Sequence, residues 1–458
     1  MKKPKHVLLI YPPLNNIVFF GTFEPLVLEI FSSIAKQEGC KVELIDIRFD
    51  PKGLENLAEK GYSPDLIGLA THGYSEVSIV NELARTCRSI WPHAVITVGG
   101  GQATITPELF DATTYDYLVK GPGENLWRRF CREGLSRQSE YQIIQDDHVS
   151  KEYTFPTPDR GISEKYRQHY RLTRGGGRAA FIVMTQGCPF RCTFCAIWPA
   201  SMKLYRLRVI DEIVTEMKSI KEDYVYIGDD NTFANYNFAN RLADELIAAG
   251  IYKKMVTACR ADHISKHPEL FEKWASIGLG EIIIGIEATS DEQLEQFNKA
   301  ANVADNIKAI QILKQCGIRP IVHLLVPPHW NHTDFDRLYD FIIEYRIETP
   351  IIIPLTPIPG TKDYKMYKEK GEIVTESEEF FTFNFNVLKP KHMGLKAFDH
   401  AYDRIEKRVY SLKRYFGGYC GDIKFMEYLR WYIFIRIYLL YLRKRRKKLY
   451  KLVNPALL

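Results

Sequence analysis

The stretch "MTQGCPFRCTFCAIW", residues 184–198, places three cysteines within eight residues: Cys188, Cys192 and Cys195. A structural zinc site is closed by four ligands, usually in two separated pairs, and no second pair accompanies this run. An iron–sulfur cubane takes one thiolate for each iron, so three thiolates leave one iron open to another ligand. The alternative is three unconnected buried thiols. The pattern favours a [4Fe-4S] cluster held by these three cysteines.

The composition is that of a globular chain. With 458 residues, of which 46% are hydrophobic and 26% charged, the chain is long enough for two or three domains. Nine cysteines, an odd number in a chain of this length, do not indicate a disulfide framework. The N-terminal "MKKPKHVLLIYPP" has an apolar run too short for a signal peptide. We therefore expect a cytoplasmic protein whose cysteine cluster binds metal.

The first 125 residues alternate short apolar strands with helices. The strands "HVLLIYPP", "KVELIDI", "DLIGLA" and "AVITVGGG" predict a parallel, doubly wound (Rossmann-like) sheet. Ligands of such sheets bind at the carboxyl ends of the strands, where "THGYS" and "GGGQAT" lie here. A plain glycine turn is the alternative for the second loop. The expected ligand-lining residues are Thr71, His72, Gly73, Tyr74, Ser75, Gly99, Gly100, Gly101, Gln102, Ala103 and Thr104.

From residue 179 the alternation of strands and helices resumes. The six strands expected there are "AFIVMTQ", "DYVYIG", "MVTAC", "EIIIGI", "RPIVHLL" and "PIIIPL". Six successive βα units predict a partial (β/α)6 barrel with its site at the carboxyl ends of the strands, and the cysteine run follows the first strand. We therefore expect an α/β protein with an N-terminal domain at 1–140, a linker at 141–178, a barrel at 179–385 and a helical region at 386–458.

The cysteine run, with an aromatic residue before its third cysteine and a βα barrel around it, resembles the radical S-adenosylmethionine superfamily. The resemblance implies that the open iron chelates the amino and carboxylate groups of S-adenosylmethionine. Cleavage of the sulfonium then gives a 5′-deoxyadenosyl radical, which removes a hydrogen atom from an unactivated carbon. Phe194 would pack near the adenine.

Further positions match the S-adenosylmethionine contacts of the superfamily. They are Gly228, Asp229, Asp230, Arg260, Gly285, Glu287 and Pro359. Gly-Asp-Asp stands where the family has a Gly-Gly-Glu-like segment, although an aspartate still suits an ammonium group. Glu287 is expected at the ribose or amino group and Arg260 at the methionine carboxylate. The alternatives are helix caps for the aspartates, a surface role for Arg260 and a plain turn at Pro359.

Two N-terminal segments resemble the cobalamin-binding subclass of the superfamily. "VGGGQATITPE" and "VKGPGEN" are similar to its Val-Gly-Gly-x-x-Ala-Thr and Gly-Glu-Gly-Glu segments, with Pro122 where an acidic residue is usual. The resemblance implies that residues 71–75 and 99–104 bind cobalamin. None of the twelve histidines lies in an Asp-x-His-x-x-Gly motif, so no histidine ligates cobalt through it. Over about residues 5–385 the chain is similar to the hopanoid C-3 methylase group.

The resemblance implies a cobalamin-dependent radical enzyme that methylates an sp3 carbon of an apolar, membrane-derived substrate, a hopanoid, lipid or tetrapyrrole. A non-methylating cyclase, rearrangement or carbon–carbon coupling enzyme is the first alternative. A cobalamin- or redox-sensing binding protein is the second. A flavodoxin or ferredoxin is the expected electron donor.

The C-terminal segment is strongly basic. Residues 404–458 hold fifteen Lys/Arg and three Asp/Glu, a balance of +12, so the rest of the chain carries −6. The apolar core at 431–442 is twelve residues long, whereas about twenty are needed to span a bilayer. We expect an in-plane anchor, peripheral at the inner membrane face. The alternative is a helix packed on the barrel. The charges are confined to one tail, so no nucleic-acid partner is expected.

Overall fold

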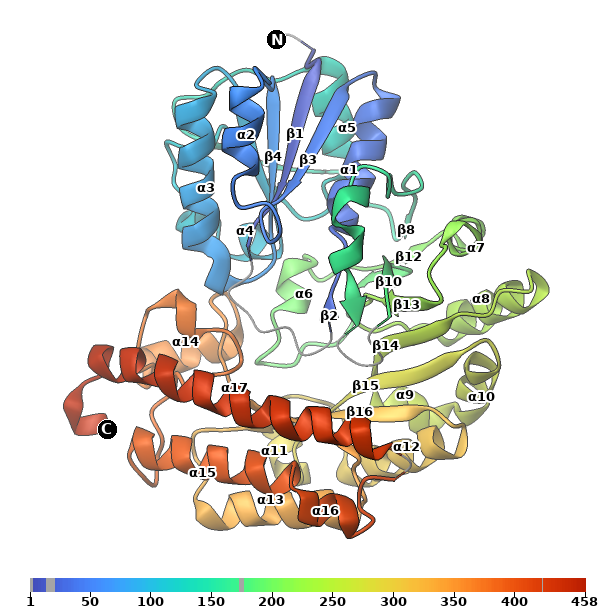
Figure 1. Ribbon diagram of the computed structural model, residues 1–458, viewed down its shortest axis with the longest axis vertical. Helices are drawn as coiled ribbons and strands as arrows, with labels where there is room; N and C mark the ends of the chain where they lie inside the picture. The colour runs from blue at the N-terminus through green and yellow to red at the C-terminus, as the bar shows by residue number, and fades with distance from the viewer. Residues whose placement is uncertain (1–2, 14–20, 173–176, 422) are drawn as a thin grey trace. The chain divides into compact units, whose positions relative to one another are not determined.

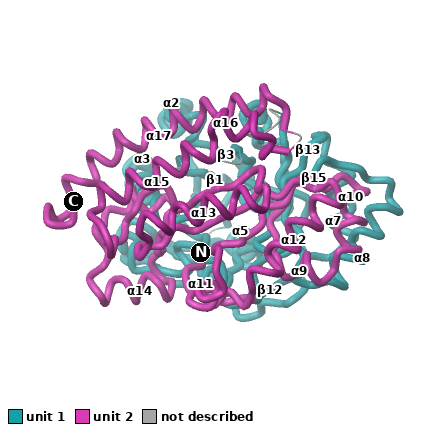
Figure 2. The backbone as a smooth tube through the Cα atoms, turned by 90° about the horizontal axis from the view of Figure 1, so that it is seen from below, with its two compact units in different colours: residues 1–189, 196–255 teal, residues 190–195, 256–458 magenta. Residues whose placement is uncertain are grey.

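The computed structural model describes residues 3–13, 21–172, 177–421 and 423–458 (Figure 1). The chain forms two compact units, unit 1 with residues 1–189 and 196–255 and unit 2 with residues 190–195 and 256–458 (Figure 2). Unit 1 therefore contains the expected N-terminal domain, the expected linker and the first strands of the expected barrel. Of that linker, residues 173–176 lie outside the described residues.

The N-terminal sheet has six parallel strands in the order β3-β1-β4-β5-β6-β7. Their bounds are β1 His6–Tyr11, β3 Lys41–Asp46, β4 Leu66–Thr71, β5 Val95–Gly100, β6 Tyr117–Lys120 and β7 Gln142–Gln145. The doubly wound sheet is confirmed. Because β7 lies beyond residue 140, the sheet extends into the expected linker. The four residues of β7 are mostly exposed, so they lack the apolar signal of a buried strand.

Helices cover both faces of this sheet (Figure 1). They are α1 Leu26–Gln37, α2 Gly53–Glu59, α3 Val77–Ile90, the short α4 Gly101–Ile105 and α5 Glu124–Glu133. On one face α1 packs on α5, where the Phe31 ring stacks on Trp127 with centroids 5.0 Å apart. The Trp127 indole N–H also donates to the Phe31 carbonyl oxygen at 2.9 Å. These two residues hold α1, the first helix on this sheet, against α5, the last one.

Within the expected linker, residues 141–172 pack into unit 1. Four of their aromatic side chains, Tyr153, Phe155, Tyr166 and Tyr170, are buried in the same apolar core as α1 and α5. The strand β9 (Arg171–Leu172) pairs antiparallel with β2 (Gly21–Thr22), and β8 (Glu152–Tyr153) pairs with β12 (Tyr205–Arg208). In the sequence these aromatic residues are separated by polar residues, so their burial in one core cannot be recognised there. The segment is a structural part of unit 1.

The second six-stranded sheet has the order β10-β13-β14-β15-β16-β17, and it confirms the six strands expected from the sequence. The strands are β10 Ala179–Ile182, β13 Tyr224–Ile227, β14 Lys254–Arg260, β15 Leu279–Glu287, β16 Arg319–Val326 and β17 Thr349–Pro354. The helices are α7 Ile210–Ser219, α8 Tyr236–Ala248, α9 Ala261–Lys266, α10 Pro268–Ser276, α11 Asp291–Gln296, α12 Val303–Gln315, α13 His332–Glu344 and α14 Lys362–Glu369. After β10 the chain forms β11 (Thr185–Gly187), which pairs antiparallel with β12 and not with the main sheet.

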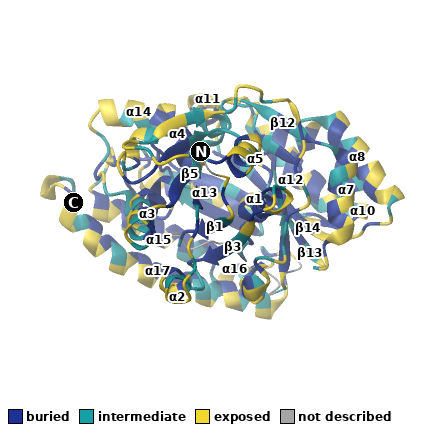
Figure 3. Ribbon diagram, turned by 90° about the horizontal axis from the view of Figure 1, so that it is seen from above, coloured by how far each residue is buried: buried dark blue, intermediate teal, exposed yellow. Residues whose placement is uncertain are grey.

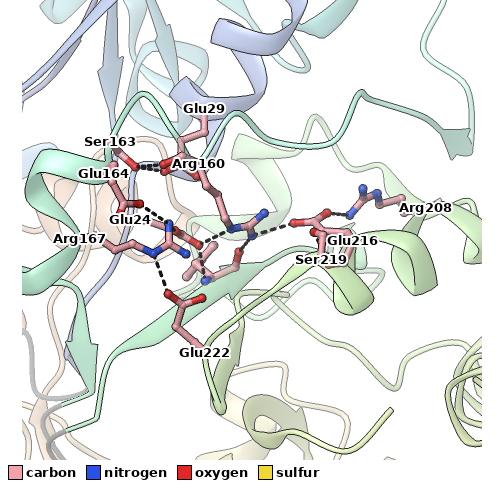
Figure 4. Close-up of polar contacts among 11 residues, drawn as sticks. Glu24, Glu29, Arg160, Ser163, Glu164, Arg167, Arg208, Glu216, Ser219 and Glu222 are labelled. Carbon is pink, nitrogen blue, oxygen red and sulfur yellow. Dashed lines mark hydrogen bonds and ion pairs between the residues drawn. The ribbon is translucent and has the colours of Figure 1, made fainter. Parts of the chain in front are cut away.

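A buried ionic network centred on Arg160 joins three parts of unit 1 (Figure 4). The guanidinium pairs with Glu24 beside α1 at 3.1 Å and with Glu216 of α7 at 2.8 Å, and it donates to the Phe181 carbonyl of β10 at 2.8 Å. In the same network Ser163 donates to the buried Glu29. Burial, and next the charge of Glu24, raises the pKa of Glu29 well above its usual value.

The C-terminal region is helical, as expected, with α15 Leu395–Val409, α16 Leu412–Phe416 and α17 Phe425–Leu452. The long α17 runs beside α15 (Figure 1) and alternates buried with exposed positions along its length (Figure 3). Four of its basic residues are paired with carboxylates of the same unit: Arg443, Arg445, Arg446 and Lys448. Within the described part of the chain, no helix is both long enough and apolar enough to cross a membrane.

Candidate functional site

Two aspartates hold the backbone that leads into the cysteine run. Asp229, which follows β13, accepts the Met184 N–H at 2.7 Å and the Thr185 hydroxyl at 2.9 Å. Asp230 accepts the N–H of Gly187, the residue before the first cysteine, at 3.0 Å. Burial raises the pKa of Asp229 to about 7. This positioning role was missed in the sequence because it depends on β11 turning away from the main sheet.

Glycines make this approach possible. A methyl group on Gly228 would lie 1.9 Å from the Phe181 ring, so only glycine fits beside that ring. Gly187 has φ +79°, and a methyl group there would lie 2.2 Å from the Leu204 carbonyl oxygen. Just beyond this turn, the Cys188 sulfur lies 3.9 Å from the side-chain nitrogen of Asn231. The end of the strand and the first cysteine are thus positioned by the same segment after β13.

The second half of the cysteine run, residues 190–195, belongs to unit 2. Thr193 N–H donates to the Phe297 carbonyl at 3.1 Å, and Asp363 N–H at the start of α14 donates to the Thr193 carbonyl at 3.2 Å. The ring of Phe194 meets Phe297 edge-on at 5.4 Å. These contacts fix the segment that carries Cys192 and leave Phe194 half-buried at an apolar cluster.

Arg260 lies at the end of β14 and its side chain is buried. Its guanidinium lies 3.8 Å from the Cys192 sulfur, pairs with Asp262 at 2.9 Å and covers the Phe190 ring at 3.7 Å. An N–H donor beside a cysteine sulfur is an outer-shell contact of the kind that orients a metal ligand. Arg260 therefore supports the second cysteine directly. The expected contact with a methionine carboxylate stays a prediction.

A buried ion pair lies at the end of β15. Glu287 has φ +67°, and its carboxylate lies 2.8 Å from the ammonium group of Lys299, also buried. A methyl group on Gly285 would lie 2.4 Å from the Glu287 carboxylate, so the glycine makes room for the pair. Lys299 was missed because it lies twelve residues further along, after a helix. Its signal in the sequence is a single lysine after α11.

Pro359 lies in the turn between β17 and α14 and is buried. The next residue, Gly360, has φ +92°, and Thr361 then caps α14 by accepting the Tyr364 N–H at 3.2 Å. Because α14 also donates to Thr193, the turn contributes to positioning the cysteine segment. Its expected role beside the adenine stays a prediction.

The two loops expected to bind cobalamin lie side by side at the carboxyl ends of β4 and β5. Thr71 hydroxyl donates to the Gly99 carbonyl at 3.1 Å, and Thr104 hydroxyl donates to the Gly100 carbonyl at 2.9 Å. Gly100 has φ +117°, and a methyl group there would lie 2.1 Å from the Thr71 carbonyl oxygen. Gln102, with Ala103 and Thr104, is buried in α4. The sheet order reverses between β1 and β4, where ligands of such sheets bind.

Residues from neighbouring strands complete this end of the sheet. The His72 ring lies 4.9 Å from the Tyr11 ring of β1, and the Arg48 guanidinium lies over the same Tyr11 ring at 4.0 Å. The His72 backbone N–H donates to Glu76 at 3.3 Å. Burial raises the pKa of Glu76 to about 7. Tyr11 and Arg48 were missed because only the sheet order brings their elements beside this loop, and Glu76 was missed although it directly follows the predicted segment.

Within unit 1 the loops expected to bind cobalamin contact the segment that follows the third cysteine. The helix α4 contacts α6 (Ile197–Ala200), and a methyl group on Gly101 would lie 3.6 Å from the Ala200 side chain. A methyl group on Gly121, in the "GPGEN" segment, would likewise lie 2.3 Å from the Met202 sulfur. The expected corrinoid-binding loops and α6, the segment that follows the third cysteine, are therefore neighbours within unit 1.

The thiols suit an iron–sulfur cluster by their chemistry. None of the three cysteines is in a disulfide, and two of their sulfurs have nitrogen donors within 4 Å, from Asn231 and Arg260. In the described part of the chain no group of three or more Cys, His, Asp and Glu side chains is already positioned to hold a metal ion. Cys188 belongs to unit 1, and Cys192 and Cys195 belong to unit 2.

Comparison with known proteins identifies both parts of the site. Residues 182–342 match the radical SAM superfamily, and residues 14–130 match the B12 binding domain. The chain is a B12-binding radical SAM enzyme. Its cofactors are a [4Fe-4S] cluster, S-adenosylmethionine and cobalamin.

Several relatives of this B12-binding radical SAM enzyme have assigned activities. It is 26% identical to the hopanoid C-3 methylase of Methylococcus capsulatus, over 86% of this chain and 78% of the relative. It is 24% identical to the anaerobic magnesium-protoporphyrin IX monomethyl ester cyclase of Cereibacter sphaeroides, over 81% of this chain and 64% of that protein. It is also 24% identical to the bacteriochlorophyllide d C-8(2)-methyltransferase of Chlorobaculum tepidum, over 69% of each chain.

The same fold is present in a solved structure. The radical S-adenosylmethionine methyltransferase TsrM from Kitasatospora setae, with cobalamin and a [4Fe-4S] cluster bound, superimposes with a TM-score of 0.65. The match covers 81% of this chain and 79% of TsrM at 16% sequence identity. At this identity the likeness establishes the fold.

Proposed function

We propose that the protein is a cobalamin-dependent radical methyltransferase that acts on an unactivated sp3 carbon of an apolar, membrane-derived molecule. The contact between α4 and α6 carries the proposal, because α6 begins two residues after the third cysteine and lies beside the loops expected to bind the corrinoid. A methyl group carried by a corrinoid has to reach the carbon from which the hydrogen atom is taken. Two of the relatives named above, which act on a hopanoid and a bacteriochlorophyllide, support an apolar substrate.

The cluster with S-adenosylmethionine supplies the radical when bound, and cobalamin supplies the methyl group. The chain's own part is to position and enclose these groups. Asp229 and Asp230 fix the approach to the first cysteine, and Arg260 stabilises the second. Asp230 is exposed and uses one oxygen for Gly187, so it is the aspartate we propose for the methionine ammonium. We also expect a flavodoxin or ferredoxin to deliver the electron.

The test uses the reconstituted holoenzyme under anaerobic conditions with methyl-labelled S-adenosylmethionine and a chemical reductant. We expect labelled methyl on the protein-bound corrinoid and release of 5′-deoxyadenosine. The control is the triple variant Cys188→Ala, Cys192→Ala and Cys195→Ala, which should form no 5′-deoxyadenosine. Absence of label from the corrinoid of an active enzyme would contradict methyl transfer.

The second candidate is a radical cyclase or carbon–carbon coupling enzyme, which the similarity to the magnesium-protoporphyrin cyclase favours. The two candidates differ in the product. With an apolar extract of cells as the source of substrate, a methyltransferase gives a labelled product that is heavier by one methylene unit. A cyclase gives 5′-deoxyadenosine and an unlabelled product.

A further inference from the structure

The outward side of α17 is apolar along its first half. The helix packs on its own unit through Tyr428, Trp431, Ile435, Tyr438, Leu439, Leu442, Arg446 and Leu449. The opposite side exposes Met426 (60%), Ile433 (48%), Ile437 (62%) and Leu440 (63%). Steps of seven, four and three residues place these four side chains on one helical face. The face is an apolar stripe, interrupted by the exposed Arg430, with no cover within the described part of the chain.

The same face is cationic along its second half. The next positions at this spacing are Lys444, Lys447 and Lys451, all exposed, and none of them has an ion pair among the described residues. The other basic side chains of this segment turn inward to carboxylates such as Glu379 and Asp403. The helix has a single acidic residue, Glu427, which is paired with Arg319 at 2.9 Å. The outward face therefore carries positive charge only.

We propose that this face, from Met426 to Lys451, docks on the surface of an anionic membrane with α17 lying in the plane of the surface. A flat bilayer accommodates both halves of the face: the apolar stripe enters the head-group boundary, and the lysines contact lipid phosphates. Two half-exposed tyrosines flank the stripe, Tyr432 and Tyr441, and aromatic rings of this kind favour that boundary. A second copy of the chain fits poorly, because in a parallel pair its lysines would meet like charges and in an antiparallel pair they would lie against the apolar stripe.

The structure alters the expectation from the sequence in two respects. Most of the apolar core at 431–442 faces the unit, and only Ile433, Ile437 and Leu440 among its strongly apolar residues remain largely exposed. Four of the six residues at 443–448 are neutralised by carboxylates, so Lys444 and Lys447 are the free charges of that block. Deleting α17 would uncover a core, so point substitutions on the outward face are the appropriate test.

The experiment measures sedimentation of the full-length protein with vesicles of phosphatidylcholine, with and without phosphatidylglycerol, at low and high salt. We expect binding only to the anionic vesicles and weaker binding as salt rises. The charge variant is Lys444→Glu, Lys447→Glu and Lys451→Glu, for which we expect binding about 100-fold weaker. The matched control, Lys52→Glu, Lys60→Glu and Lys218→Glu, changes the same charge on exposed lysines of unit 1 and should bind like the parent.

A second variant tests the apolar half. Ile437→Ser with Leu440→Ser keeps every charge and should also bind anionic vesicles more weakly, with the thermal unfolding of the parent. Three results would each overturn the proposal: no binding of the parent at low salt, equal losses in the charge variant and its control, or a parent dimer that the variants dissociate without any vesicle binding. The proposed methyl transfer does not depend on the outcome, since the 5′-deoxyadenosine assay is done without lipid.

Discussion

Arg260 shows how one buried side chain can set the properties of a cofactor ligand. Its guanidinium is held by Asp262 and by the Phe190 ring, so it approaches the Cys192 sulfur in a fixed orientation. Hydrogen bonds and positive charge at a ligand sulfur raise the reduction potential of an iron–sulfur cluster. The residue was expected to pair with the methionine carboxylate of S-adenosylmethionine, and the structure gives it a contact with Cys192, an expected cluster ligand.

We predict that Arg260→Gln lowers the midpoint potential of the reconstituted cluster and weakens iron retention by about 10–100-fold. The loss of a cation and of an N–H donor beside Cys192 is the reason. A redox titration monitored by electron paramagnetic resonance measures the midpoint potential, and iron analysis after desalting measures how much iron the protein retains. Arg260→Lys keeps the charge, so its midpoint potential should lie between those of the parent and Arg260→Gln. An unchanged potential in Arg260→Gln would show that the guanidinium does not act on the cluster.

At the scale of elements, the turn from β5 into α4 depends on one glycine. Gly100 has φ +117° and abuts the Thr71 carbonyl oxygen, so a side chain there is both strained and obstructed. Gly99, one residue earlier, has only the Val119 side chain and backbone near it, at 3.5 Å and beyond. The two glycines offer a matched pair of substitutions in the same loop.

We predict that Gly100→Ala destabilises unit 1 by at least about 1–3 kcal/mol and weakens cobalamin binding, because the two corrinoid loops must separate. Gly99→Ala should keep both properties near those of the parent. Thermal unfolding of the apoprotein and the absorbance of retained cobalamin provide the two measurements. Equal unfolding temperatures and equal cobalamin retention in the two variants would mean that the close contact at Thr71 is relieved without loss of stability.

The sequence predicted strands better where both faces are buried. The runs "DLIGLA" and "RPIVHLL" are continuous apolar segments, and both are strands of the parallel sheets. The four-residue β7 and the antiparallel β11 have no such run, and their partners are distant or irregular. The site follows the same rule. The cysteines and glycine loops form local motifs, whereas Lys299 and Arg48 reach the site only through tertiary structure.

At the scale of the molecule, the network around Arg160 holds unit 1 together. We predict that Arg160→Met destabilises unit 1 by about 3–5 kcal/mol, because Glu24 and Glu216 would then remain buried without their shared cation. Urea unfolding with a probe in each sheet measures the loss. A matched control is Arg132→Met, which removes an exposed partner of Glu38 and should cost much less stability. Similar costs for both would contradict the proposed role of the network.

Glu29 gives the same network a dependence on pH. Its pKa in the folded chain lies well above the usual 4.5, so folding takes up a proton once the pH exceeds that value. Stability contributed by this group is complete below about pH 4.5 and declines as the pH rises toward the folded pKa. We predict that Glu29→Gln unfolds at a higher temperature than the parent at pH 8, with a smaller difference at pH 5. A parent that gains stability relative to Glu29→Gln as the pH rises would contradict this sign.

The aromatic residues of 141–178 that complete the N-terminal core have a consequence for protein engineering. A cobalamin module excised at residue 140 would lose Tyr153, Phe155, Tyr166 and Tyr170 from its apolar core, together with the cation of its ionic network. Such a fragment should aggregate when expressed alone. Chimeras that exchange corrinoid specificity between relatives should instead take all of unit 1, residues 1–189 and 196–255, from one donor, so that the sheet, its aromatic closure and the first barrel strands stay together.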